Sequence, residues 1–137
     1  MEIILHRVVD CKQNKFIKMA TKTLVIGASE NPERYSYKAV QMLRAHEKDV
    51  IAFGRKEGII GDTVITKQLP EKVIETVTLY SNAEAQKEYY DYLIALHPKR
   101  IIFNPGTENE ELYDLLKAND IKPLEACTLV MLSTGQY

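Results

Sequence analysis

From residue 21 onward the chain alternates short apolar runs with amphipathic stretches, and this alternation restricts its fold more than any other feature. Continuous apolar runs such as residues 23–26 are typical of strands that are covered on both faces. Apolar residues spaced three and four apart, as in residues 37–45, predict helices between the strands. Strands that alternate with helices form parallel sheets with right-handed crossovers. The sequence therefore predicts an α/β fold, a Rossmann-like doubly wound parallel sheet of about five strands in a three-layer α/β/α arrangement.

The runs that predict strands lie at residues 23–26, 50–53, 76–80, 100–103 and 121–127. Between the second and third runs, several glycines and Pro70 predict a loop, with a short strand at Val64 and Ile65 left open. Two capping boxes are expected to start helices, Ser81 with Glu84 and Thr107 with Glu110. Ligands of such sheets bind beyond the carboxyl ends of the strands. We therefore expect the functional residues in the segments that directly follow the five runs.

Length and composition favour one ordinary globular domain. The chain has 137 residues, 45% of them hydrophobic and 27% charged, and 18 basic against 19 acidic residues leave a net charge of -1. This balance predicts neither nucleic acid nor a membrane surface as a partner. No apolar run reaches the roughly 20 residues that a membrane helix needs. Cys11 and Cys127 lie far apart, which favours a reducing, cytoplasmic compartment and predicts neither a disulfide framework nor a metal site.

The first 20 residues look detached from the rest, because they have mixed charge and no clear period. We divide the chain into a leader at residues 1–20 and a single domain at residues 21–137. Two interpretations of the leader stay open. In the first, the leader is disordered or loosely docked, or the start codon has been assigned too early. In the second, it adds an edge strand at residues 3–9.

The turn after the first strand has the features of a phosphate site. Gly27 allows close approach of the backbone, and the start of the following helix offers unpaired N–H groups and a positive dipole end. Ser29 and Ser36 add hydroxyl groups, and Arg34 adds a cation that binds phosphate oxygens in bidentate fashion. The alternative is a tight turn at Gly27 and a helix cap at Ser36, without a ligand.

The same turn departs from the dinucleotide-binding pattern G-x-G-x-x-G. Only its first glycine is present, because Ser29 takes the place of the second and Pro32 that of the last. A pyrophosphate approach of the dehydrogenase type is therefore disfavoured. After the second strand, Arg55 and Lys56 stand where an NAD site would have an acidic residue for the ribose. These cations suit a phosphorylated ribose, as in NADP or coenzyme A, although a solvated basic turn is the alternative.

The later strand ends offer further candidates. The segment Asn104-Pro105-Gly106 opens a helix, so its backbone N–H groups are either ligand donors or part of a capped turn. Tyr80 closes the third strand and either packs on a ligand or lies at the rim. Cys127 follows the fifth strand, but no base stands near it in the sequence, so a buried apolar role is favoured over a catalytic one. No catalytic residue is predicted.

In their order and spacing these segments resemble the small CoA-binding proteins, the stand-alone relatives of the CoA-binding domain of succinyl-CoA synthetase α subunits. The resemblance is strongest at residues 25–29, followed by Pro32, Arg34 and Ser36-Tyr37, and it continues in the turns at residues 53–56 and 106–108. It covers most of the chain after the leader. The chain departs from the family after Cys127, where a cysteine-proline continuation is usual and an apolar tail stands instead. Val130 to Leu132 in this tail either pack on the domain or form a homodimer contact.

The resemblance implies a five-stranded Rossmann-like fold that binds coenzyme A or an acyl-CoA. It implies a pyrophosphate at residues 27–29 and an adenosine phosphate near Arg55 and Lys56. The residues expected to contact the cofactor are Gly27, Ala28, Ser29, Arg34, Tyr35, Ser36, Arg55, Lys56, Tyr80, Asn104, Pro105, Gly106 and Cys127. We expect a non-catalytic sensor, carrier or regulatory module. The alternatives are an NADP-dependent reductase and a protein-interaction domain that has lost its ligand.

Overall fold

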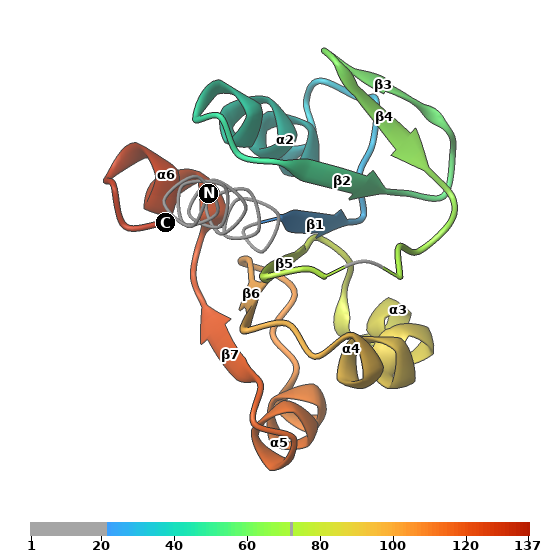
Figure 1. Cartoon of the computed structure of the whole chain (residues 1–137), viewed down its shortest axis with the longest axis vertical. Helices are drawn as coiled ribbons and strands as arrows, with labels where there is room; N and C mark the ends of the chain where they lie inside the picture. Colours follow the sequence, from blue (N-terminus) through green and yellow to red (C-terminus); the bar gives the residue numbers. More distant parts are fainter. Residues whose placement is uncertain (1–21, 72) are drawn as a thin grey trace, which may run out of the picture.

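The computed structural model describes residues 22–71 and 73–137 (Figure 1). The leader at residues 1–20, with its two interpretations, lies outside the described residues. Seven strands form one sheet in the order β3-β4-β2-β1-β5-β6-β7. Their bounds are β1 Thr23–Ile26, β2 Val50–Phe53, β3 Gly58–Ile60, β4 Thr63–Thr66, β5 Thr76–Leu79, β6 Arg100–Phe103 and β7 Lys122–Glu125. Neighbouring strands are parallel except β3 and β4, which form an antiparallel hairpin at one edge.

Helices connect the parallel strands and cover both faces of the sheet. Their bounds are α2 Tyr35–Ala45, α3 Ala83–Gln86, the 3-10 turn η1 Lys87–Tyr89, α4 Tyr90–Leu96, α5 Glu110–Ala118 and α6 Thr128–Ser133. Figure 1 shows α2 and α6 on one side of the sheet and α3, α4 and α5 on the other. Within the described ranges, no helix is long and apolar enough to cross a membrane.

The central strand β1 shows why the chain folds into three layers. Leu24 and Ile26 join the apolar cluster that contains Leu93 of α4 and Leu112 of α5. Val25 points to the opposite face, into a cluster with residues of α2, α6 and the β3–β4 hairpin. Both faces of this strand are therefore buried, as its continuous apolar run requires. The predicted fold class is confirmed.

The hairpin makes the sheet larger than the predicted five strands. The short strand that was left open at Val64 and Ile65 is part of β4, and β3 pairs with it through Ile59 opposite Val64. Gly61, at φ 60°, occupies the first of the two turn positions between them, where a left-handed residue matches the twist of a hairpin. Ile59 and Val64 are both exposed, which hides the alternation that marks a half-buried strand.

Both predicted capping boxes are wrong by one or two residues. Asn82 starts α3 and accepts a hydrogen bond from the Ala85 N–H at 2.9 Å. Asn109 starts α5 and accepts from the Leu112 N–H at 3.2 Å. The Thr107 hydroxyl instead donates to the Asn104 carbonyl at 2.8 Å, which closes the turn after β6. An asparagine one or two residues after the expected residue therefore supplies the cap in each case.

The apolar tail forms α6 and packs against α2. Met131 and Leu132 are buried, which supports the packed alternative, whereas Val130 stays exposed. Behind α6 the chain ends on the sheet, because the Tyr137 hydroxyl hydrogen bonds Thr23 and the Arg100 guanidinium lies 4.6 Å from the centre of the Tyr137 ring. The tail thus closes one side of the core.

Candidate functional site

The candidate residues follow strands that are consecutive in the sheet, β2, β1, β5, β6 and β7. From β1 the chain continues into α2 on one face, whereas from β5 it continues into α3 and α4 on the other face. These two strands are neighbours, so the crevice at which ligands bind such sheets lies between their carboxyl ends. Gly27–Ser29 and Tyr80 flank this crevice.

In the first turn, two of the three candidate amides are already used by the protein. The Gly27 and Ala28 N–H groups both donate to the Phe53 carbonyl of β2, at 3.0 and 2.9 Å. The Ser29 N–H has no partner among the described residues, and the Ser29 hydroxyl accepts from the Asn31 N–H at 3.1 Å. The Gly27 and Ala28 amides, which were expected to contact the cofactor, are thus bonded within the protein, whereas the Ser29 N–H is not.

The start of α2 supplies those groups. Arg34 precedes the helix in an extended conformation, and no side chain caps the helix. In the part of the chain that the structure describes, the first-turn N–H groups of Tyr35, Ser36 and Tyr37 have no hydrogen-bond partner. Ser36 is buried, while Arg34 and Tyr35 are exposed. Unpaired N–H groups and the positive end of the helix dipole form an anion site.

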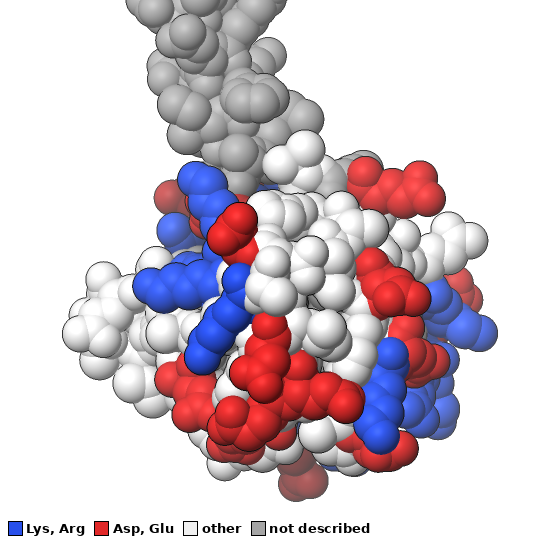
Figure 2. All heavy atoms as spheres, turned by 90° about the horizontal axis from the view of Figure 1, so that it is seen from below, with Lys and Arg blue, Asp and Glu red and all other residues white. Residues whose placement is uncertain are grey.

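The amino end of α5 differs from that of α2. Asn109 caps α5, and Glu110 and Glu111 fill its first turn, whereas the first turn of α2 holds no acidic residue. Figure 2, a view from the α5 side of Figure 1, shows a group of acidic side chains gathered on this face. The start of α2 is therefore electrostatically more favourable to an anion than the start of α5, because acidic side chains at a helix start oppose a second negative charge.

Two glycines bring the strand-end turns into backbone contact. A Cβ on Gly54 would lie 2.3 Å from the Ala28 carbonyl oxygen. Gly27 has φ 98°, and a Cβ there would lie 3.1 Å from the Tyr80 carbonyl carbon. Real side chains do not tolerate such contacts without a backbone shift. The turns after β2, β1 and β5 thus pack against one another at positions that only glycine permits.

The two cations after β2 carry no ion pair among the described residues. Arg55 and Lys56 are exposed, and the described ion pairs join Arg44 to Asp62 and Lys87 to Glu84. The Glu30 carboxylate accepts the Ile59 N–H of β3 at 2.8 Å and forms no ion pair with either cation in the described structure. Arg55 and Lys56 are therefore free to meet an anion next to the first turn.

Below the crevice, Asn104 joins three elements. Its Nδ2 donates to the Thr78 hydroxyl at 2.6 Å and to the Leu79 carbonyl at 2.8 Å, and its Oδ1 accepts the Thr128 N–H at 2.9 Å. The side chain is 2% exposed, so it supports the site from inside. Because Thr128 is held there, the half-buried free thiol of Cys127 lies at the start of α6 next to β5.

Tyr80 and Ser81 differ from these bonded groups. The Tyr80 hydroxyl and the Ser81 hydroxyl are buried, and neither has a hydrogen-bond partner in the described structure. Burial raises the pKa of the Tyr80 hydroxyl to about 12. The phenol therefore stays protonated even at moderately alkaline pH, so its O–H is available as a hydrogen-bond donor.

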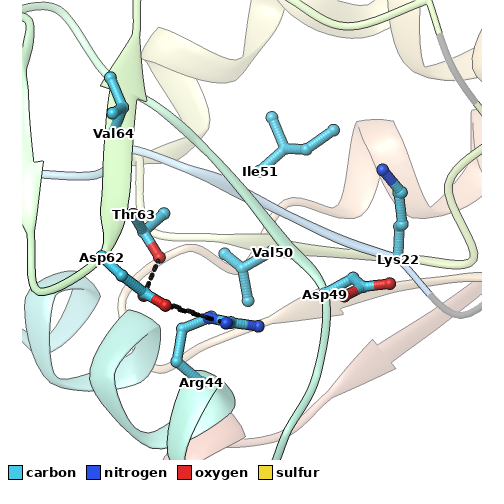
Figure 3. A pocket seen from close by; sticks show the side chains of 8 residues that line it. All are labelled: Lys22, Arg44, Asp49, Val50, Ile51, Asp62, Thr63 and Val64. Carbon is cyan, nitrogen blue, oxygen red and sulfur yellow. Dashed lines mark hydrogen bonds and ion pairs between the residues drawn. The ribbon is translucent and has the colours of Figure 1, made fainter.

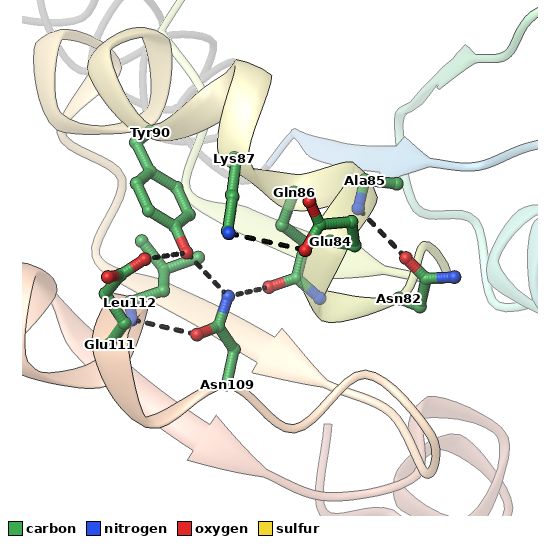
Figure 4. A network of polar contacts seen from close by, with 9 residues as sticks. All are labelled: Asn82, Glu84, Ala85, Gln86, Lys87, Tyr90, Asn109, Glu111 and Leu112. Carbon is green, nitrogen blue, oxygen red and sulfur yellow. Dashed lines mark hydrogen bonds and ion pairs between the residues drawn. The ribbon is translucent and has the colours of Figure 1, made fainter.

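A glutamine that sequence reasoning missed connects the turns after β5 and β6 (Figure 4). Gln86 is fully buried, and its Nε2 donates to the Ser81 and Thr107 carbonyls, at 2.8 Å each. Its Oε1 accepts from Asn109 Nδ2 at 2.8 Å. The Gly106 N–H is also taken, by the exposed Glu108 carboxylate at 2.9 Å. The turn that holds Pro105 and Gly106 is therefore rigidly placed, with little free donor capacity of its own.

A hollow of about 360 Å³ lies at the opposite, amino-terminal end of the strands (Figure 3). Lys22 and Val50 line it, and the Arg44–Asp62 ion pair, with 3.0 Å between Nη2 and Oδ2, borders it. This ion pair is exposed and hence contributes little to stability. Because none of the candidate residues lines this hollow, it is separate from the crevice.

Comparison with known proteins gives one family and several solved structures. A family model described as a CoA binding domain matches residues 21–133. The crystal structure of an uncharacterized protein is 46% identical with a TM-score of 0.82, and the match covers 85% of this chain and 98% of that chain. A Thermus thermophilus protein, cell-free ID.343, shares the fold at 16% identity and a TM-score of 0.72, with 93% and 98% covered. A hypothetical protein from Pyrococcus horikoshii OT3 does so at 20% identity and 0.76, with 91% and 90% covered. No curated protein matches the chain.

Proposed function

Because the chain belongs to the CoA binding domain family, we propose that it binds coenzyme A or an acyl-CoA as a small module without catalysis of its own, in a sensor, carrier or regulatory role. One observation carries the ligand assignment. The first turn of α2 presents unpaired N–H groups, no capping side chain and no acidic residue at the crevice beside β5. That arrangement suits a pyrophosphate, which together with the ribose phosphate carries the negative charge of the cofactor.

The remaining parts of the ligand follow from this position. The pyrophosphate lies on Ser29 and the start of α2, with Arg34, Tyr35 and Ser36 beside it. The phosphorylated ribose lies toward the exposed Arg55 and Lys56, whose charges are unpaired in the described structure. The uncharged arm then runs along the crevice toward Tyr80, the turn at residues 104–106 and Cys127.

Calorimetry tests the proposal against its alternatives. We expect the full chain to bind coenzyme A and to gain about 2.7 kcal/mol of unfolding free energy at 100 times its dissociation constant. Stronger binding of NADPH than of coenzyme A would support the reductase alternative. A chain that binds neither nucleotide and shows no thermal shift would match the protein-interaction alternative and contradict the proposal.

A double variant tests the ribose phosphate contact. If Arg55→Ala with Lys56→Ala removes both cations, coenzyme A should bind about 30-fold more weakly, because each charge-assisted hydrogen bond to a phosphate is strong. Dephospho-CoA, which lacks this phosphate, should lose less than threefold. The matched control is Lys117→Ala with Lys122→Ala, which removes the same charge from exposed positions on α5 and β7. Equal weakening of both ligands would refute the role of Arg55 and Lys56.

A further inference from the structure

Two unpaired hydroxyl groups stand side by side in the chain at the carboxyl end of β5. Tyr80 Oη and Ser81 Oγ are enclosed, and among the side chains that the structure describes they are the buried polar atoms without a hydrogen-bond partner. Native proteins pair almost all such groups, because an unpaired buried hydroxyl is costly. Both residues directly follow β5, which pairs with β1 at the crevice, so a molecule bound there is the candidate for the missing partners.

Neighbouring groups do not satisfy these hydroxyls. The Thr78 and Thr128 hydroxyls lie close to Tyr80 Oη but outside hydrogen-bonding geometry with it. They hydrogen bond each other at 2.8 Å, and Thr78 also accepts from Asn104. Gln86 bonds the Ser81 carbonyl and leaves the Ser81 hydroxyl free. The protein therefore uses its other buried polar side chains here and leaves two donors unused.

The surroundings decide what kind of acceptor fits. Tyr80 packs against the apolar cluster that contains Val40, Leu43 and Leu132. The titratable and polar groups that influence the Tyr80 hydroxyl are the Thr78 and Thr128 hydroxyls, the Cys127 thiol and the Tyr137 phenol, and none of these is a cation. A phosphate would lack charge compensation in such a place. A neutral carbonyl oxygen needs only a donor, and both hydroxyls provide one.

We propose that the hydroxyls of Tyr80 and Ser81 donate hydrogen bonds to the carbonyl oxygens of the uncharged amide arm of the ligand. This inference rests on the proposed function and extends it. In it, Tyr80 and Ser81 recognise the pantetheine arm, whereas the groups at the start of α2 and after β2 bind the nucleotide. Both residues are partly exposed as a whole, and contact with a ligand in the crevice requires each enclosed hydroxyl to rotate outward.

The test compares two ligands on conservative variants of the full chain. Tyr80→Phe and Ser81→Ala should each weaken coenzyme A about fivefold in calorimetry, the usual effect of one lost hydrogen bond. Neither should change the affinity for adenosine 3′,5′-bisphosphate, which lacks the arm. Neither should lower the melting temperature of the free protein, because each removes an unpaired buried group.

Tyr113→Phe is the matched control. The Tyr113 hydroxyl of α5 donates to Glu125 at 2.5 Å, on the face of the sheet opposite α2, so its loss should lower the melting temperature and leave both affinities unchanged. Unchanged affinity for coenzyme A in both crevice variants would overturn the inference while leaving the proposed function intact. A lower melting temperature of free Tyr80→Phe would also overturn it, because the hydroxyl would then be bonded within the protein. If the unaltered chain binds neither ligand, the proposed function itself fails, and the inference falls with it.

Discussion

Gly54→Ala is expected to lower the free energy of unfolding by at least about 3 kcal/mol, because the new Cβ meets backbone and not a movable side chain. It would lie 2.3 Å from the Ala28 carbonyl oxygen and 3.0 Å from Ile65 Cγ2. Ala28 is itself held to β2 by its hydrogen bond to Phe53, so it cannot withdraw without losing that bond. Urea unfolding of the full chain, followed by circular dichroism, measures the loss.

Two glycines nearby serve as controls for this prediction. A Cβ on Gly58 would meet only the carboxyl end of Glu30, which can rotate away, so Gly58→Ala should cost about 1 kcal/mol for the lost Glu30–Ile59 hydrogen bond. Gly61 has open space but φ 60°, so Gly61→Ala should cost roughly 1 to 2 kcal/mol through backbone strain alone. A Gly54→Ala loss no larger than these would show that the two turns separate easily.

The fold was largely predictable because its signal is local. A strand that is covered on both faces is rich in apolar and β-branched residues, so β1, β2, β5 and β6 appear directly as runs in the sequence. The hairpin is different, because Ile59 and Val64 face outward and β3 has only three residues. The hairpin forms because β3 and β4 pair across a turn, and the hydrophobic periodicity of the sequence does not indicate this pairing.

For the candidate site, the sequence predicts which strand-end segments come together but not their hydrogen bonds. Strand ends locate the crevice, yet the use of the Gly27 and Ala28 amides by Phe53 follows from how closely β2 approaches β1. Gln86 shows the same limit, since a glutamine in a polar helix start reads as exposed until the turns after β5 and β6 enclose it. Contacts between segments distant in the chain determine which donors remain for a ligand.

Asn104→Leu is the second variant for which we expect a large loss, about 4 kcal/mol of unfolding free energy. Leucine fills a similar volume, so the loss comes from the polar groups and not from a cavity. It leaves the Thr128 N–H and the Leu79 carbonyl without the side-chain partner that both have now, in a place where water does not reach. Each unsatisfied buried group costs roughly 1 to 3 kcal/mol, and a domain of this size has only about 5–15 kcal/mol in total.

The control for Asn104→Leu is Asn119→Leu at the end of α5, where the amide donates to the Leu115 carbonyl at 2.8 Å but stays partly exposed. Water replaces that bond, so its loss should stay within about 1 kcal/mol. If Asn104→Leu costs no more than this control, α6 does not depend on Asn104.

The larger expected loss has a consequence for binding as well, because Thr128 holds Cys127 and α6 beside Tyr80. A chain that stays folded but loses this bond should therefore bind the uncharged arm of coenzyme A less well than it binds adenosine 3′,5′-bisphosphate, relative to the unaltered protein.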